Sequence, residues 1–312
     1  MKNILIFGST GFIGSKLLSK LLLFDYNITF FTRRNLINTD LNKICDERFE
    51  IKIGSLEDFE LIERIIIKKS INIVIHLSTT LIPSSSFNEY LQDLNSIIFP
   101  TIKLLPIFSK FNIKFIYFSS GGSVYEINDS GIYTENNITS PISYYGQSKK
   151  MIEDSIILEN KISNLNYIII RPSNPFGIGQ NIYGKQGFIG VAIGCLLNNK
   201  TLTVWGDGNI IRDYIYIDDL IECVISIIKG NTNNEIYNIG NGEGKSLNEI
   251  IEIINQITDK KLSIQYERSR AIDPPRIILN MNKFNALYKF ERISLEDGIY
   301  KFFEFEKSKI LK

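Results

Sequence analysis

Tyr145 and Lys149, a tyrosine and a lysine four residues apart, are the pair in this 312-residue sequence best suited to acid–base chemistry. The spacing places both side chains on one face of a helix. A free tyrosine has a pKa of about 10, and a neighbouring ammonium group favours its ionised form. Tyr145 is therefore predicted to take the proton of a hydroxyl group while a hydride leaves the carbon that bears it.

A segment rich in hydroxyl groups precedes this pair, directly after an expected strand over residues 115–118. It reads Ser119-Ser120-Gly121-Gly122-Ser123-Val124-Tyr125. Its hydroxyls could orient a carbonyl or hydroxyl group of a substrate. Tyrosine and lysine pair on many helices for structural reasons, so this position after a strand is what favours a catalytic interpretation of Tyr145 and Lys149.

A glycine-rich turn near the start of the chain predicts a binding site for a dinucleotide. The turn follows an expected strand over 4–7 and opens a helix. Its glycines would let backbone N–H groups approach a pyrophosphate at the positive end of that helix. The spacing is G-x-x-G-x-x-G, which differs from the usual G-x-G-x-x-G. The predicted cofactor contacts in the turn are Gly8, Thr10, Gly11, Phe12, Ile13 and Gly14.

The end of the second expected strand bears on the choice between NAD and NADP. It reads Thr32-Arg33-Arg34 and lacks the carboxylate that would bind a ribose 2′-hydroxyl. Arginine suits a 2′-phosphate, so the sequence favours NADP. The alternative is that Arg33 and Arg34 are solvated surface charges.

Further cofactor contacts are expected after a strand that ends just before Gly54 and after the strand over 73–75. Ser55 and Leu56 would lie along the adenine, and Leu77, Ser78 and Thr80 would lie near a ribose. His76, the one histidine, is expected to be a structural residue at a strand end.

Strands alternate with helical patterns through the first half of the chain. The strands are expected over 4–7, 28–31, 73–75, 115–118 and 167–170, and the helices over 15–24, 56–69, 91–109 and 149–161. This alternation predicts a parallel sheet, and near-continuous Ile, Val and Phe predict that helices cover both of its faces. The expected fold class is α/β, a doubly wound Rossmann sheet.

After residue 170 the sequence becomes rich in Gly, Pro, Asn and Ser, with short mixed elements. We expect a dinucleotide-binding domain over 1–170 and a smaller C-terminal α/β lobe for substrate over 171–312. Residues 237–239 are expected to return to the sheet, so that the two parts interleave.

Composition narrows the function classes. Lys plus Arg number 35 and Asp plus Glu 34, a net charge of +1, which gives no electrostatic footprint for nucleic acid or a membrane surface. One histidine and three cysteines fit neither a metal site nor a disulfide framework. The chain is therefore predicted to bind no metal. It shows neither an apolar run long enough to span a membrane nor a signal peptide, so it is predicted to be cytoplasmic.

Taken together, these motifs resemble the extended short-chain dehydrogenase/reductase family, and within it the nucleotide-sugar epimerases. The matching segments run through nearly the whole chain: 8–14, 119–125, Tyr145 with Lys149, 171–177, 212–219 and 270–273. The resemblance implies a nicotinamide cofactor, a nucleotide-sugar substrate and a place in polysaccharide biosynthesis. It also implies a homodimer formed through helices of the nucleotide-binding domain, including the helix after Tyr145.

The resemblance assigns roles residue by residue. Tyr145 would be the base, and Lys149 its electrostatic partner and a ribose ligand. The resemblance also implies that Pro172 contacts the cofactor. It assigns Asn174, Arg212 and Arg270 to the substrate pyrophosphate and Asp273 to the substrate ribose. Arginine guanidinium groups suit phosphate oxygens.

The sequence departs from the family at one catalytic position. The Ser or Thr that orients the substrate oxygen corresponds to Gly121 here, so Ser123, or else Ser120, must replace it. Ser123 is favoured as the catalytic residue, and Ser120 is predicted to contact substrate. The related 4,6-dehydratases have Thr-Asp-Glu where this chain has Gly121-Gly122-Ser123. Since water elimination needs that acid pair, dehydration is disfavoured.

Three functions remain open. The favoured one is epimerisation at carbon 4 of a nucleotide sugar, with transient oxidation. The second is NADPH-dependent reduction of a 4-keto deoxysugar linked to dTDP, UDP or GDP, which Thr32-Arg33-Arg34 supports. The third is a redox-sensing dinucleotide-binding module without activity, which would have no need of Tyr145 and Lys149.

Overall fold

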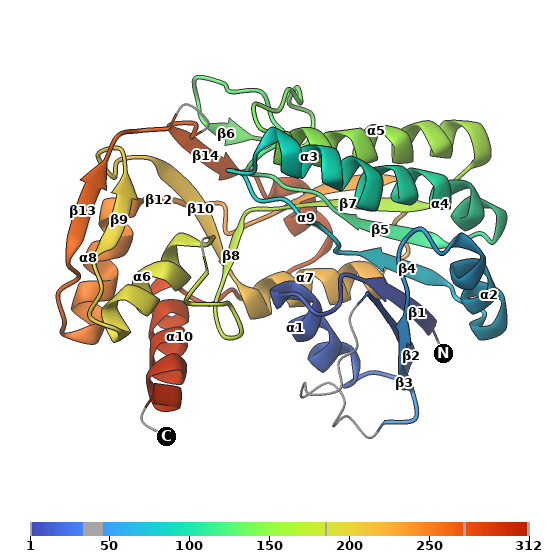
Figure 1. The fold of residues 1–312 in the computed structure, drawn as a ribbon, viewed down its shortest axis with the longest axis horizontal. Helices are drawn as coiled ribbons and strands as arrows, with labels where there is room; N and C mark the ends of the chain where they lie inside the picture. Colours follow the sequence, from blue (N-terminus) through green and yellow to red (C-terminus); the bar gives the residue numbers. More distant parts are fainter. Residues whose placement is uncertain (1, 34–45, 185, 271–272, 311–312) are drawn as a thin grey trace. The chain divides into compact units, whose positions relative to one another are not determined.

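The computed structural model describes residues 2–33, 46–184, 186–270 and 273–310, which form two compact units (Figure 1). The first unit comprises the described residues within Met1–Ser119, Ser143–Ile170 and Lys229–Ile236. The second comprises those within Ser120–Ile142, Arg171–Ile228 and Tyr237–Lys312. The units thus alternate along the chain. The functional domains 1–170 and 171–312 stay a prediction, since these units are defined by packing alone.

A seven-stranded sheet organises the first unit, in the order β11-β7-β5-β4-β1-β2-β3. The strands are β1 (Lys2–Phe7), β2 (Tyr26–Thr32), β3 (Phe49–Ile53), β4 (Ile73–His76), β5 (Lys114–Phe118), β7 (Tyr167–Pro172) and β11 (Glu235–Ile239). Strand β1 pairs in parallel with both β2 and β4, so the strand order reverses there. In open α/β sheets, ligands bind at the carboxyl ends of the strands at such a switch point. The predicted doubly wound sheet is confirmed, including the return of 237–239 within β11.

The helices of the first unit are α1 (Phe12–Leu21), α2 (Phe59–Lys69), α3 (Phe87–Asp93), the π-helical turn η2 (Leu94–Ile98), α4 (Phe99–Lys110) and α5 (Tyr144–Ser163). Helices α4 and α5 lie side by side (Figure 1). The single helix predicted over 91–109 is not continuous, because the π-turn η2 separates α3 from α4. Helix α5 begins five residues before its predicted start, because the Ser143 hydroxyl accepts a hydrogen bond from the Gly146 N–H (3.1 Å) and caps it there.

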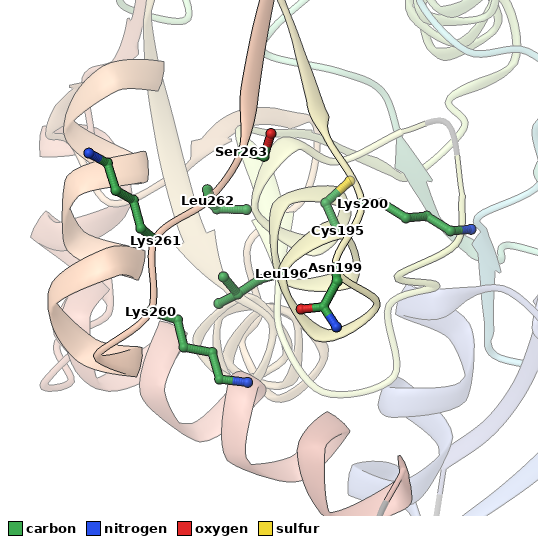
Figure 2. A pocket seen from close by; sticks show the side chains of 8 residues that line it. All are labelled: Cys195, Leu196, Asn199, Lys200, Lys260, Lys261, Leu262 and Ser263. Atoms are coloured by element: carbon green, nitrogen blue, oxygen red, sulfur yellow. The ribbon is translucent and has the colours of Figure 1, made fainter.

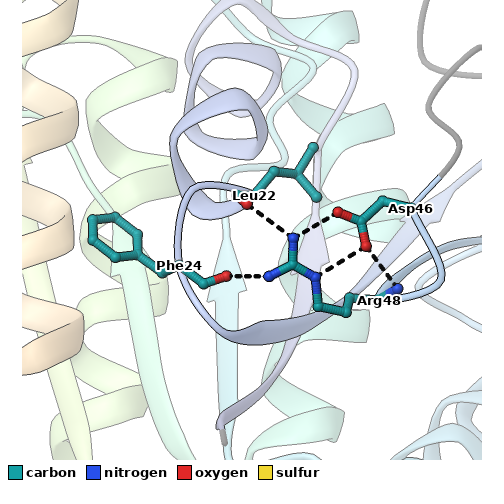
Figure 3. A network of polar contacts seen from close by, with 4 residues as sticks. All are labelled: Leu22, Phe24, Asp46 and Arg48. Atoms are coloured by element: carbon teal, nitrogen blue, oxygen red, sulfur yellow. Dashed lines mark hydrogen bonds and ion pairs between the residues drawn. The ribbon is translucent and has the colours of Figure 1, made fainter.

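An arginine joins α1 to the start of β3 (Figure 3). The Arg48 guanidinium donates to the carbonyl oxygens of Leu22 (3.1 Å) and Phe24 (2.7 Å), beyond the end of α1. It also binds both carboxylate oxygens of Asp46 (3.0 and 2.7 Å). One planar cation thereby binds two carbonyl oxygens in the turn between α1 and β2 as well as the Asp46 carboxylate. Arg48 therefore ties the turn before β2 to the start of β3, at the amino ends of both strands.

The second unit contains a five-stranded sheet and a two-stranded one. Its strands are β6 (Ile132–Tyr133), β8 (Asn174–Phe176), β9 (Leu202–Trp205), β10 (Ile211–Tyr216), β12 (Gly244–Ser246), β13 (Ile264–Glu267) and β14 (Arg276–Leu279). Its helices are α6 (Phe188–Leu197), α7 (Ile217–Lys229), α8 (Leu247–Thr258), α9 (Asn282–Leu287) and α10 (Leu295–Ile310). Strand β10 is central, because β8, β12 and β14 all pair with it.

A fully buried carboxylate fixes β10 within that sheet. Asp213 accepts hydrogen bonds from the backbone N–H groups of Asn241 (2.8 Å), Gly242 (3.1 Å) and Leu279 (3.2 Å). Burial raises the pKa of Asp213 to about 6, and these three donors partly oppose that rise. Asp213 therefore ties β10 to β14 and to the loop after β11.

Candidate active site

The glycine turn lies between β1 and α1, where the sequence places it. Gly8 has a φ of +77°, and a Cβ there would lie 2.5 Å from the backbone nitrogen of Ser78. A Cβ at Gly14 would lie 2.6 Å from the carbonyl oxygen of Ser9. Only glycine allows this turn to lie so close to the loop after β4. Helix α1 starts after Gly11, which has no side chain to cap it, so N–H groups at this end remain for a ligand.

The other predicted residues of the turn and of the second strand lie as follows. Thr10 and Gly11 are exposed, and Phe12 and Ile13 are half-buried at the start of α1. Thr32 is the buried last residue of β2, and Arg33 follows it exposed to solvent. Arg34 lies outside the described residues.

The remaining cofactor residues predicted in the first unit lie in the loops after β3 and β4. Ser55 and Leu56 follow β3, and the Ser55 N–H donates to the Asp58 carboxylate (2.6 Å). Leu77 and Ser78 run beside Gly8. Thr80 lies farther along the same loop and binds Asp93 through its hydroxyl (2.5 Å). Gly8 and these loops thus meet at one edge of the sheet.

Tyr145 and Lys149 share one face of α5, as their spacing predicts. The Lys149 Nζ lies 5.7 Å from the centroid of the Tyr145 ring and 5.3 Å from that of Tyr117. Lys149 is 4% exposed and donates a hydrogen bond to the carbonyl oxygen of Phe118 (3.0 Å), at the end of β5. The Lys149 amine therefore lies at the carboxyl end of β5, next to the half-buried ring of Tyr145.

Burial and charge act in opposite directions on this lysine. Burial lowers the pKa of Lys149 to about 8, while the negative charges of Asp93 and Glu153 favour the ammonium form. His76 lies fully buried at the end of β4, and its Nε2 is 2.9 Å from the Thr101 hydroxyl. Burial, together with the Lys149 charge, lowers the pKa of His76 to about 3. The imidazole is therefore neutral, as a structural residue at a strand end would be.

The segment that follows β5 belongs to the second unit. The Gly121 N–H donates to the carbonyl oxygen of Pro172 (2.9 Å), and the Ser123 N–H to that of Ser120 (3.3 Å). A Cβ at Gly121 would lie 2.5 Å from a methyl group of Leu279, whereas a Cβ at Gly122 would meet nothing within 4 Å. The packing therefore explains why a serine is absent at 121. Ser120 is buried and Ser123 half-buried.

The residues that the resemblance assigns to substrate gather in the second unit. Asp273 lies between two arginines: one of its oxygens accepts a hydrogen bond from Arg270 (2.8 Å), and the other lies 3.8 Å from Arg212. Arg212 is mostly buried, and it also donates to the Pro274 carbonyl oxygen (2.7 Å). The Asn174 amide donates to the carbonyl oxygen of Asp213 (2.8 Å), next to Arg212 in β10. The four predicted residues thus form one group.

Sequence reasoning missed three residues close to these groups. The Arg270 guanidinium lies 5.3 Å from the ring centroid of Trp205, which is half-exposed and could stack on a planar base. Its being the one tryptophan, next to a glycine turn, was a usable signal. Asp93 and Ser148 are hydrogen bonded to each other beside Lys149 (2.6 Å), and no sequence spacing connects them.

A separate surface cavity of about 370 Å³ lies in the second unit (Figure 2). Cys195, Lys200, Lys260 and Lys261 are among its lining residues, and none of the described residues that line it belongs to the groups above. Over the described ranges, no three His, Cys, Asp or Glu side chains are placed to hold a metal ion. None of the helices in that part of the chain has the length and apolarity that a membrane crossing needs.

Residues 4–240 match the profile of the NAD dependent epimerase/dehydratase family. The chain is 32% identical over 297 residues to a protein of Methanocaldococcus jannaschii provisionally named a UDP-glucose 4-epimerase, with 95% of each chain covered. It is 30% identical over 311 residues to dTDP-4-dehydro-6-deoxyglucose reductase of Escherichia coli, with 96% of each covered.

Among solved structures, UDP-glucose 4-epimerase of Thermotoga maritima with UDP-glucose superposes with a TM-score of 0.90 at 28% identity, covering 99% of both chains. The family profile, the whole-length relatives and the seven-stranded sheet all indicate the same fold. The chain belongs to the NAD-dependent epimerase/dehydratase family, and it is an NAD(P)-dependent enzyme with the fold of the extended short-chain dehydrogenases/reductases.

Proposed function

We propose that this enzyme epimerises carbon 4 of a nucleotide sugar, with Tyr145 as the base. The observation that carries the proposal is the buried Lys149 ammonium below the Tyr145 ring, at the carboxyl ends of β4 and β5. A cation held there stabilises a phenolate without help from solvent. The whole-length similarity to UDP-glucose 4-epimerases supports this choice of substrate.

The first unit fits a dinucleotide. The cradle at Gly8 would be filled by any Cβ, and the buried Ser9 hydroxyl in the same turn has no partner among the described residues. Gly8, Gly11 and the N–H groups at the start of α1 would hold the pyrophosphate. Leu77, Ser78, Thr80 and Pro172 would lie along the nicotinamide half, and Ser55 and Leu56 along the adenine. Lys149 has two ammonium hydrogens besides the one given to Phe118, and these would bind a ribose hydroxyl.

A nicotinamide cofactor, when bound, would supply the acceptor for the hydride released from carbon 4 and the donor that returns it in the second half of the reaction. The Tyr145 phenolate takes the proton of the 4-hydroxyl as that hydride leaves, and gives it back when the hydride returns. Ser123, or else Ser120, donates a hydrogen bond to the oxygen on carbon 4. Between the two steps the 4-keto sugar rotates, so that the hydride returns to its opposite face. Meanwhile Arg212, Arg270 and Asn174 bind the pyrophosphate, and Asp273 binds the ribose.

One assay tests the reaction. The purified protein is incubated with UDP-glucose, and separately with a 4-keto-6-deoxy nucleotide sugar and NADPH. Formation of UDP-galactose without net consumption of cofactor supports the epimerase. Loss of NADPH absorbance in proportion to the keto sugar, with no epimerisation, would replace it by a 4-keto reductase.

That reductase is the second candidate, and Arg33 favours it. A reductase consumes NADPH and must select its 2′-phosphate, and Arg33 stands exposed directly after β2, where that phosphate would lie. The E. coli relative is itself a dTDP-sugar reductase.

The homodimer through α5 also stays a prediction. That helix exposes Leu158 and Ile162, which a second copy could cover.

NADP(H) is expected to bind more tightly than NAD(H). Replacing Arg33 by alanine should weaken NADPH binding about tenfold, the value of one charge-assisted hydrogen bond, and leave NADH binding unchanged. Isothermal titration calorimetry with both cofactors measures this. Equal affinity in the wild type, or a preference for NAD(H), would show that Arg33 is a solvated surface charge.

Replacing Arg270 by alanine is expected to raise the KM for the nucleotide sugar by about tenfold to a hundredfold, because a charged hydrogen-bond donor to the pyrophosphate is lost. Cofactor affinity should change little. The control is Arg268→Ala, which removes an exposed arginine from the same segment. Steady-state kinetics give both constants, and an unchanged KM would remove Arg270 from the pyrophosphate site.

A further inference from the structure

Asp93 is a fully buried carboxylate in the first unit to which neither the motifs nor the proposed reaction gives a role. It is the last residue of α3, and the π-helical turn η2 starts directly after it. A π-turn costs regular helix hydrogen bonding and is frequently found at functional positions. A buried negative charge must also be compensated by specific partners. Asp93 must therefore have hydrogen-bond partners that compensate its burial.

Its two oxygens bind two different elements. One accepts hydrogen bonds from both the hydroxyl (2.5 Å) and the N–H (3.3 Å) of Thr80, in the loop after β4. The other accepts from the hydroxyl of Ser148 on α5 (2.6 Å). Ser148 is itself buried and precedes Lys149 in the chain. One carboxylate thus connects the loop predicted to line the cofactor ribose with the turn of α5 that carries Tyr145 and Lys149.

We propose that Asp93 is a positioning residue, which holds the Thr80 loop and the Tyr145–Lys149 turn of α5 in one arrangement and supplies a negative charge to the buried Lys149 amine. This inference rests on the proposed role of Tyr145 and Lys149. The hydrogen bonds tie the loop after β4 to the turn of α5 that carries the amine, and a carboxylate acceptor makes such bonds stronger than neutral ones. Without the charge, burial would act on Lys149 with less opposition.

The charges around Lys149 must be considered together. The titratable groups that act on it come from four elements: Tyr145 and Glu153 on α5, Tyr117 on β5, His76 on β4, and Asp93 at the end of α3. His76 is neutral, and burial raises the pKa of Tyr117 well above its ordinary value, so that phenol is neutral too. Asp93 and Glu153 are therefore the two groups that favour the ammonium form of Lys149.

The decisive measurement is the titration of Lys149 itself. In protein with ¹³C,¹⁵N-labelled lysine, the Lys149 resonance is assigned by its loss in Lys149→Met and followed by NMR from neutral to alkaline pH. Asp93→Asn should lower its midpoint by about one pH unit, because an opposite charge nearby is removed. Asp154→Asn, which removes a charge from the exposed face of α5, should leave it unchanged. An unchanged midpoint in Asp93→Asn would overturn the electrostatic part of the proposal.

The positioning part is tested with the charge kept in place. Ser148→Ala and Thr80→Val each remove one hydroxyl donor to Asp93, and each should lower kcat for UDP-glucose about tenfold, the value of one charged hydrogen bond, without moving the Lys149 midpoint. A wild-type kcat in both variants would overturn this part of the proposal. Both variants can also be measured if Asp93→Asn does not fold. If the wild type turns over no nucleotide sugar, the proposed reaction fails, yet the NMR titration still decides the role of Asp93.

Discussion

Replacing Tyr145 by phenylalanine is expected to lower kcat about a thousandfold, within the range that a positioned acid–base group contributes. The change removes one oxygen atom and leaves the ring above Lys149 in place. Cofactor affinity should stay close to that of the wild type, because Gly8, Gly11 and Lys149 are untouched. Initial rates with UDP-glucose, or with a 4-keto sugar and NADPH, measure the first quantity, and calorimetry measures the second.

The neighbouring tyrosine provides a matched control. Tyr144 also lies in the first turn of α5, but it is 41% exposed and stacks on Tyr90 (centroids 5.2 Å apart). Tyr144→Phe removes the same atom from the other phenol and should leave kcat near the wild-type value. If Tyr145→Phe kept substantial activity, the base would have to be another group, and the mechanism proposed above would be wrong.

Replacing Lys149 by methionine is expected to lower kcat at neutral pH by about a hundredfold or more, because the phenolate of Tyr145 loses the cation that stabilises it. Methionine keeps much of the length and apolar volume of the buried stem. The remaining activity should rise only at higher pH than in the wild type, since Tyr145 then ionises without help. Cofactor affinity should also fall, as the proposed ribose ligand is gone.

The wild type should differ from this variant at alkaline pH as well. Because the pKa of Lys149 is lowered to about 8, its ammonium form is lost as the pH rises through that value, and wild-type activity should decline there. Lys149→Met should show no such decline. The control is Lys150→Met, which removes a cation paired with Asp154 on the helix surface (2.5 Å). It should keep the wild-type pH profile, and a wild-type profile in Lys149→Met would refute the role given to the ammonium.

Helix α5 combines a feature that a local sequence pattern encodes with one that it does not. A spacing of four predicts that Tyr145 and Lys149 share a helix face, and they do. The pattern of apolar residues did not predict where the helix begins, because the start depends on a cap from Ser143 and not on periodicity. The π-turn within the helix predicted over 91–109 was missed for a related reason, since hydrophobic periodicity cannot report one widened turn.

Side-chain contacts between residues far apart in the sequence leave no pattern from which they could be predicted. Thr80 was predicted as a cofactor contact, yet its partner Asp93 is 13 residues away, and Ser148 lies 55 residues from Asp93. Trp205 beside Arg270 is a further case, because the stacking of their side chains follows from how β9 and the segment after β13 are placed. Such contacts are set by packing, which local patterns do not encode.

The sequence by itself determined the parallel sheet, the glycine turn and the Tyr145–Lys149 face, because each depends on residues that are neighbours in one strand, turn or helix. The tertiary structure alone decided how Lys149 is charged and which groups hold it, and it brought Arg212, Arg270 and Asp273 into one cluster. These features depend on burial and on charges brought together by the fold, and both arise only when distant segments pack against one another.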